Sequence, residues 1–277
     1  MRIFLSFAGR LKYPMKKISV LILLTANVLY STSQVKNKVI NGLYLQWGYN
    51  TEWYTKSNIH FRDIVNGVNH NFTIYKAKAH DRNDLDAITK KPFEISIPQY
   101  NYRIGFYLNR NRTKAIEINY DHTKYIIYNN QLLHAKGTIG TAYFDKDTAF
   151  NASQLHFEHT NGANFYQINY VRQYILKNIN QRPVFTALWK AGGGILIPKT
   201  DVTLSGKRVD NKYHIAGYCV GAEGGGRWYF GKKWFLEGTA KTGFANYTNA
   251  LAAGGGRVNH SFGYFELIGT VGYDIKF

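Results

Sequence analysis

The sequence has few acidic residues, a single cysteine and no apolar run long enough to cross a membrane as a helix. Lysine and arginine total 35 against 17 aspartate and glutamate, which gives a formal charge of +18. The lone Cys219 excludes an intramolecular disulfide framework. The main apolar run, residues 18–30, falls short of the roughly 20 residues that a transmembrane helix needs. The chain is therefore neither a disulfide-stapled scaffold nor a helically anchored membrane protein.

The apolar run is typical of a secretory leader. It follows Met15 and two lysines and ends in small residues at the positions that signal peptidase reads, just before Gln34. We therefore interpret residues 1–33 as a signal peptide, and residues 1–14 are consistent with an upstream mis-start. With no cysteine near the cleavage point, a lipoprotein is not expected. The leader holds five basic and no acidic residues, so the charge of the mature chain, residues 34–277, falls from +18 to +13.

The last fifteen residues, 263–277, alternate between apolar and polar side chains. The apolar parity holds Phe265, Leu267, Val271, Tyr273, Ile275 and Phe277, and the other holds Glu266, Thr270, Asp274 and Lys276. In an outer-membrane barrel such a strand turns its apolar face to lipid and its polar face inward. The ending on Tyr273, Ile275 and Phe277 resembles the terminal signature of bacterial outer-membrane barrels. The barrel-assembly machinery is therefore an expected partner.

Seven upstream segments repeat this two-residue period. They are residues 43–54, 99–108, 113–128, 164–176, 184–197, 213–230 and 234–247. Long connections alternate with short ones, as in barrels with long extracellular loops and short periplasmic turns. The long ones are residues 55–98, 129–163, 198–212 and 248–261. The pattern predicts an all-β fold: an antiparallel up-and-down transmembrane β-barrel of eight strands, monomeric, in the cell outer membrane.

A soluble lipocalin-type barrel is the alternative architecture, with its apolar face inside. The apolar sets here are rich in Tyr, Trp, Phe and Leu, and the opposite sets carry charges of both signs, which favours the membrane barrel. Eight strands leave room only for side chains. Buried charges must pair, so we expect an interior ion-pair network; a proton or ion path is the other interpretation. The interior set is Arg103, Lys190, Arg227 and Lys241 facing Glu52, Glu117, Asp121, Glu223, Glu237 and Glu266.

The basic excess falls mostly at the predicted periplasmic end, where it would lie beside anionic phospholipid headgroups. This placement explains the charge without a nucleic-acid partner. All nine histidines fall at the opposite, loop end. Because histidine is a common general base near neutral pH, a catalytic site at this rim is one hypothesis, with His122 and His159 as first candidates and Asp121 and Glu158 beside them. The other interpretation is that the histidines hydrogen-bond loop backbones. No metal-ligand spacing is present, and no cofactor is predicted.

Six segments together resemble a family of small outer-membrane barrel proteins of Gram-negative bacteria that has no established activity. They are WGYNTEWYTKSNIHF (47–61), IPQYNYRIGFYL (97–108), NYDHTKYII (119–127), FEHTNGANF (157–165), GGGILIPKTDVTL (192–204) and HSFGYFE (260–266). The resemblance implies the barrel fold and no mechanism. Lipid A deacylases are also eight-stranded barrels, and they use a His-x-Ser pair with a Glu. The adjacent His260 and Ser261 lack the intervening residue, so no role is carried over.

Three functional hypotheses follow. The first is a non-enzymatic barrel with a structural or surface-binding role through its extracellular loops, with outer-membrane lipids including lipopolysaccharide as partners. The second is an enzyme that modifies lipid A or phospholipid in the outer leaflet with the histidine and acid residues named above. The third is a lateral passage for small hydrophobic molecules between strands. The filled interior and the missing deacylase motif favour the first.

Overall fold

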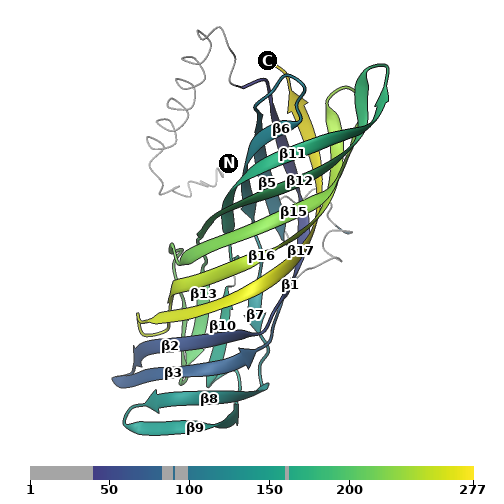
Figure 1. The fold of residues 1–277 in the computed structure, drawn as a ribbon. Coiled ribbons are helices and arrows are strands. Elements are labelled where there is room, and N and C mark those ends of the chain that lie inside the picture. The colour runs from purple at the N-terminus through teal and green to yellow at the C-terminus, as the bar shows by residue number, and fades with distance from the viewer. Residues whose placement is uncertain (1–39, 83–89, 91–98, 160–161) are drawn as a thin grey trace, which may run out of the picture. The chain divides into compact units, whose positions relative to one another are not determined.

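Eight long antiparallel strands pair edge to edge into a closed ring (Figure 1). The computed structural model describes residues 40–82, 90, 99–159 and 162–277, so the predicted signal peptide lies outside the described residues. The ring closes because the first and last of these strands pair from Leu43↔Ile275 to Tyr54↔Tyr264. In ring order the strands are β1 (Leu43–Tyr54), β5 (Tyr100–Tyr107), β6 (Lys114–Asp121), β11 (Phe165–Ile179), β12 (Arg182–Leu196), β15 (Gly217–Phe230), β16 (Trp234–Leu251) and β17 (Arg257–Ile275).

The predicted antiparallel barrel is confirmed, and β1 has the bounds that the alternation predicts. The third predicted strand, residues 113–128, is wrong as a single element. Strand β6 ends at Asp121, and β7 (Tyr125–Ile127) belongs to a second sheet. Between them the backbone leaves the ladder with β11: the Thr123 carbonyl accepts from the Ala163 N–H, and the Lys124 carbonyl accepts from the side-chain hydroxyl of Tyr54. These bonds replace the ladder and turn the chain out of the barrel.

The barrel wall has the inverse polarity of a soluble protein. Its inward side chains are buried and mostly polar or charged. The outward side chains are exposed and apolar, which is the polarity that a lipid environment requires. They include Leu45, Trp53, Ile104, Ile118, Ile168, Trp189, Val220, Trp228, Trp234, Leu236, Phe244, Phe265 and Leu267. Within the described residues, no helix is both long and apolar enough to cross a membrane.

Much of the sequence predicted as long loops forms strands. Residues Arg257–His260 of β17 pair with β2 (Ser57–Val65), and the sheet continues through β3 (Val68–Ala77) and β8 (Leu132–Ile139) to β9 (Ala142–Ala149). A separate five-stranded sheet has the order β14 (Lys207–Asp210), β13 (Thr200–Leu204), β10 (Leu155–His159), β7 and β4 (Ala79–His80). We call the barrel end with Leu43 and Ile275 the terminal end, and the end that carries these added strands the distal end.

The added distal strands share a hydrophobic core with the distal end of the barrel. The Phe61 ring stacks on Phe72 with centroids 5.2 Å apart and meets Phe157 edge-on at 5.8 Å. Tyr125 of β7 stacks on Phe262 of β17 at 4.6 Å. All five side chains are buried. Because aromatic side chains bury large areas, the distal end is a folded body joined to the barrel wall rather than a set of free loops.

Candidate functional site

The barrel interior contains a network of ion pairs. Lys190 on β12 lies at its centre: its Nζ is 2.7 Å from Glu237, 2.9 Å from Glu117 and 3.3 Å from Glu223. Arg103 on β5 pairs with Glu223 at 2.6 Å. All these side chains are essentially inaccessible to solvent. The pairing of every central charge is what burial in a low-dielectric interior demands.

The network extends toward both ends of the barrel. Toward the distal end, Lys241 bonds to Asp121 at 2.5 Å and lies 3.5 Å from Glu266. Toward the terminal end, Arg227 pairs with Glu237 at 2.7 Å, and its guanidinium carbon lies 4.0 Å from the centre of the Phe235 ring. Ion pairs therefore occur along the length of the interior. The predicted ion-pair network is present in the structure except at Glu52, which accepts a hydrogen bond from the Tyr54 hydroxyl and has no ion pair among the described residues.

The candidate residues Asp121 and His122 are adjacent in sequence but point to different surroundings. Asp121 faces the barrel interior and bonds to Lys241. His122 follows the last residue of β6; its Nδ1 lies 2.8 Å from the Asn164 side-chain oxygen, and its ring stacks on Tyr100 at 4.7 Å. Burial lowers the pKa of His122 to about 4, with a further lowering from nearby Lys124 and an opposing contribution from Asn164. The ring is therefore neutral at physiological pH.

Glu158 and His159 lie on β10 of the five-stranded sheet. Glu158 pairs with His156 at 3.3 Å and with Arg82 at 3.5 Å. His159 is fully buried, and its Nε2 lies 3.1 Å from Nε2 of His260 on β17. Asp121, His122, Glu158 and His159 thus each have their own partners. Whether any of them acts chemically stays a prediction.

The pair of His159 and His260 is a contact that sequence reasoning did not predict. The remaining ring nitrogens also have partners: Thr200 Oγ1 lies 3.3 Å from His159 Nδ1, and Ser57 Oγ lies 3.4 Å from His260 Nδ1. The rings of Tyr125, Tyr247, Phe157 and Phe262 surround the pair. The sequence indicates only that residues 258, 260 and 262 share one face of a strand, which places His260 among buried residues but does not identify His159 as its partner.

Burial sets the charge state of this pair. It lowers the pKa of His159 to about 3, although Glu158 acts in the opposite direction. It lowers the pKa of His260 well below 6.5, and His159 adds to the lowering. Two neutral rings can share one hydrogen bond, because one nitrogen donates and the other accepts. Ser57 and Thr200, whose hydroxyls contact the pair, are also buried, so neither is open to a large substrate. The arrangement joins the five-stranded sheet to β17.

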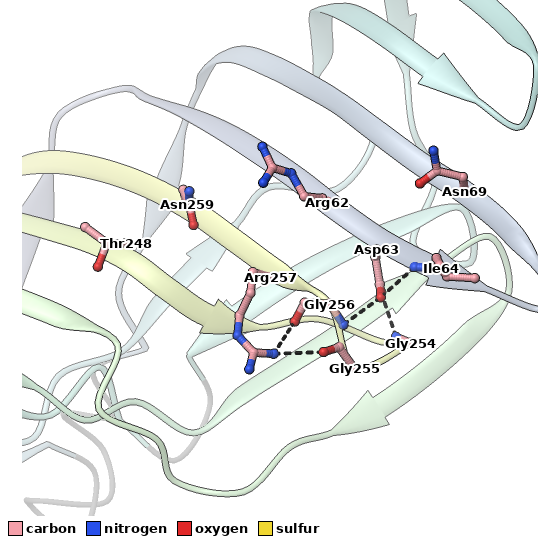
Figure 2. Close-up of a pocket in the computed structure, with 10 residues that line it drawn as sticks. All are labelled: Arg62, Asp63, Ile64, Asn69, Thr248, Gly254, Gly255, Gly256, Arg257 and Asn259. Atoms are coloured by element: carbon pink, nitrogen blue, oxygen red, sulfur yellow. Dashed lines mark hydrogen bonds between the residues drawn. The ribbon is translucent and has the colours of Figure 1, made fainter.

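An open cavity of about 630 Å³ lies at the distal end where β2, β3 and the β16–β17 turn meet (Figure 2). Arg62 of β2 and Arg257 of β17 are direct cross-strand partners, and both are exposed. Among the described residues, neither guanidinium has a carboxylate within ion-pair distance. Figure 2 shows the two side chains splayed apart, with Arg257 donating to the carbonyls of Gly255 and Gly256 at 2.8 and 2.9 Å. Like charges directly opposite each other repel, so the cavity favours an anion.

Asp63 fixes the turn that carries Arg257. Its carboxylate accepts the backbone N–H groups of Gly254 at 2.6 Å and Gly256 at 2.8 Å. A Cβ atom at Gly254 would lie 1.9 Å from the Ile64 carbonyl oxygen, so the turn approaches β2 as closely as glycine allows. Asp63 is buried and its oxygens are occupied by backbone donors. The acid therefore holds the turn in place and leaves the two arginines as the dominant charges of the cavity.

Comparisons with known proteins give only remote structural likenesses. No family model matches the sequence, and no curated protein matches it. Among solved structures, the outer membrane protein OprG from Pseudomonas aeruginosa is 8% identical, with a TM-score of 0.42 over 86% of this chain and 97% of that one. Neisserial surface protein A is 11% identical, with a TM-score of 0.37 over 85% and 97%. The outer membrane protease OmpT from Escherichia coli is 10% identical, with a TM-score of 0.37 over 89% and 100%.

The protein is a transmembrane β-barrel. An apolar outer surface, a charged interior and a closed ring with no free strand edge in the membrane region form the combination that lets strands cross a bilayer. Within the described part of the chain, no cluster of three or more His, Cys, Asp or Glu side chains could hold a metal ion. The site with the most distinctive chemistry at the distal end is the cavity around Arg62 and Arg257.

Proposed function

We propose that the protein is a non-enzymatic outer-membrane barrel whose distal end faces outward and binds an anionic sugar, such as the phosphorylated core of lipopolysaccharide. The observation that carries this proposal is the cross-strand pair of Arg62 and Arg257 beside an open cavity. Two guanidinium groups can offer several N–H donors to the oxygens of one phosphate. An anion between them would also relieve their repulsion.

The surroundings of the arginines support a sugar ligand. Asn69, Thr248 and Asn259 line the same cavity and offer amide and hydroxyl groups that can bond to sugar hydroxyls. Along β17, Arg257 lies eight residues beyond the outward aromatic Phe265, which corresponds to about 27 Å of strand. This distance would place the cavity above the lipid tails, among the sugars of the outer leaflet.

The positions of the histidines favour binding over lipid chemistry. A general base must reach the proton that it abstracts, yet His159 is inaccessible to solvent and His122 is 8% exposed. Both rings are bonded to neighbouring side chains. The filled interior also argues for a function at the barrel's surface rather than through its lumen.

The test is a titration of the protein, held in phospholipid nanodiscs, with phosphorylated core oligosaccharide freed from lipid A. We expect saturable binding that weakens at least tenfold in Arg62→Gln, because one charge-assisted hydrogen-bond set is worth about 1.5–3 kcal/mol. The matched control is Lys146→Gln, an exposed cation on β9 that pairs in register with Ala135 and so lies on the opposite face of the distal sheet. Equal losses in the two variants, or no binding by the unaltered protein, would contradict the proposal.

A further inference from the structure

The terminal mouth of the barrel contains a second cavity, of about 340 Å³, with a strong positive charge. Its cations come from the β5–β6 and β15–β16 turns, from the first residue of β12 and from the residues after β17. The cations are Arg110, Arg112, Arg182, Lys232 and Lys276. The sequence predicts that these side chains lie beside phospholipid headgroups, whereas the structure brings the five together around one opening.

Asp274 is the single acidic side chain in the lining of this cavity as the described residues define it. It is already engaged, because it accepts a hydrogen bond from the Tyr107 hydroxyl at 2.8 Å and lies 3.5 Å from Arg112. Five cations against one satisfied carboxylate leave a large uncompensated charge in a concave site. Such a site concentrates anions from solution.

Two of the residues that line this cavity are buried polar residues of the barrel strands. Gln173 on β11 and Thr186 on β12 are each 2% exposed and belong to the lining. Within the described residues, the Gln173 Nε2 and the Thr186 Oγ1 have no hydrogen-bond partner. Unsatisfied buried donors are costly, and both can donate to an oxyanion. Charge alone would suit any anion, but neutral donors among the lining residues favour a ligand with several oxygens.

We propose that this cavity binds a phosphate group. A volume near 340 Å³ lies at the lower end of the range for small-molecule sites, which suits a phosphate with a small substituent. The phosphate belongs either to a free solute or to the headgroup of an anionic phospholipid that reaches in from the adjacent leaflet. In both cases the arginine and lysine side chains bind the charge while Gln173 and Thr186 donate to its oxygens. This inference is independent of the distal cavity.

The experiment compares two double variants that each lose one arginine and one lysine at the same end of the barrel. Arg182→Gln with Lys232→Gln alters the cavity. Arg172→Gln with Lys233→Gln is the control, because those side chains lie over the rings of Tyr174 and Tyr273 outside the lining. Calorimetry measures pyrophosphate binding in phosphatidylcholine nanodiscs, and native mass spectrometry measures retention of phosphatidylglycerol from mixed nanodiscs.

We expect the cavity variant to lose at least tenfold in one of the two assays, while the control changes less than twofold. Loss in the calorimetric arm identifies a free phosphate, and loss in the lipid arm alone identifies a headgroup. Thr186→Val, which removes one donor with little change of shape, should weaken the same ligand several-fold without altering the fold. Equal losses in the cavity variant and the control would show diffuse attraction and overturn the site. So would a failure of the unaltered protein to bind in both arms.

Discussion

Replacement of Lys190 by methionine should strongly destabilise the barrel. The Lys190 ammonium group lies within 3.3 Å of three buried carboxylates, those of Glu117, Glu223 and Glu237. Methionine fills a similar volume but removes the charge that all three carboxylates share. Arg103 keeps contact with Glu223 at 2.6 Å and Arg227 keeps contact with Glu237 at 2.7 Å, whereas Glu117 keeps only the longer contact to Arg103 at 3.7 Å and so loses most. Removal of one partner from a buried pair costs about 3–5 kcal/mol, and we expect a loss of unfolding free energy in that range.

The assay is urea unfolding of the protein refolded in detergent micelles, followed by tryptophan fluorescence and by the gel shift between folded and unfolded barrel. A second variant, Lys190→Met with Glu117→Gln, removes one charge of each sign. Its unfolding free energy should be at least 1 kcal/mol higher than that of Lys190→Met, because residues in contact have coupling energies of about 0.5–3 kcal/mol. A loss below 1 kcal/mol in the single variant, or no recovery in the double variant, would refute the idea that the interior is held by paired charges.

Three further predictions concern the distal end. Acid should weaken the contact between β10 and β17, because the pKa values of His159 and His260 are lowered in the folded state. The stability that the two neutral rings contribute is therefore complete above pH 6.5. It falls by up to about 1.4 kcal/mol per pH unit for each ring as the pH drops toward 3. Hydrogen exchange measured across this pH range should show that the protection of β10 falls as the pH drops. His260→Phe should make that protection less dependent on pH. Gly255→Ala should lower stability by about 1 kcal/mol in urea unfolding, because residue 255 has φ +91° and an added Cβ meets no other atom; no loss would mean that the turn relaxes. Asp63→Asn should weaken binding of phosphorylated core oligosaccharide while the barrel's urea midpoint changes little, since it loosens only the turn that positions Arg257; unchanged binding would contradict that role.

The barrel could be predicted from sequence because each of its strands has one face toward lipid and one toward a polar interior. Because the two faces of each strand meet such different surroundings, apolar and polar residues alternate along β1 and β17, and this alternation is visible in the sequence. The interior charges were predicted for the same reason. The break in the strand after Asp121 could not be predicted, because residues 113–128 have a strand-like composition throughout. The break depends on hydrogen bonds to Tyr54 and Ala163, which are distant in sequence.

The distal strands were harder to predict for two physical reasons. Strand β13 is only five residues long and is buried on both faces, so its short alternation of Val202 and Leu204 with polar residues is too brief to be told from a loop. Strand β2 does alternate, with Ile59, Phe61 and Val65 buried, yet nothing in one strand's sequence specifies that it pairs with β17. The cross-strand register of Arg62 and Arg257 follows from that pairing, and the contact of His159 with His260 follows from the packing of the five-stranded sheet on β17. Candidate residues chosen by proximity in sequence therefore missed the contacts that the fold makes.

The most direct test of the central claim compares lipids from outer membranes with and without the protein. If the protein binds sugars of the outer leaflet without changing them, mass spectrometry of lipid A and phospholipids should give identical spectra across growth conditions. A defined mass change that appears with the protein and disappears in His122→Ala or His159→Ala would contradict the account. That result would establish an enzyme that acts on the outer leaflet, and the mass difference would identify the bond that it cleaves or forms.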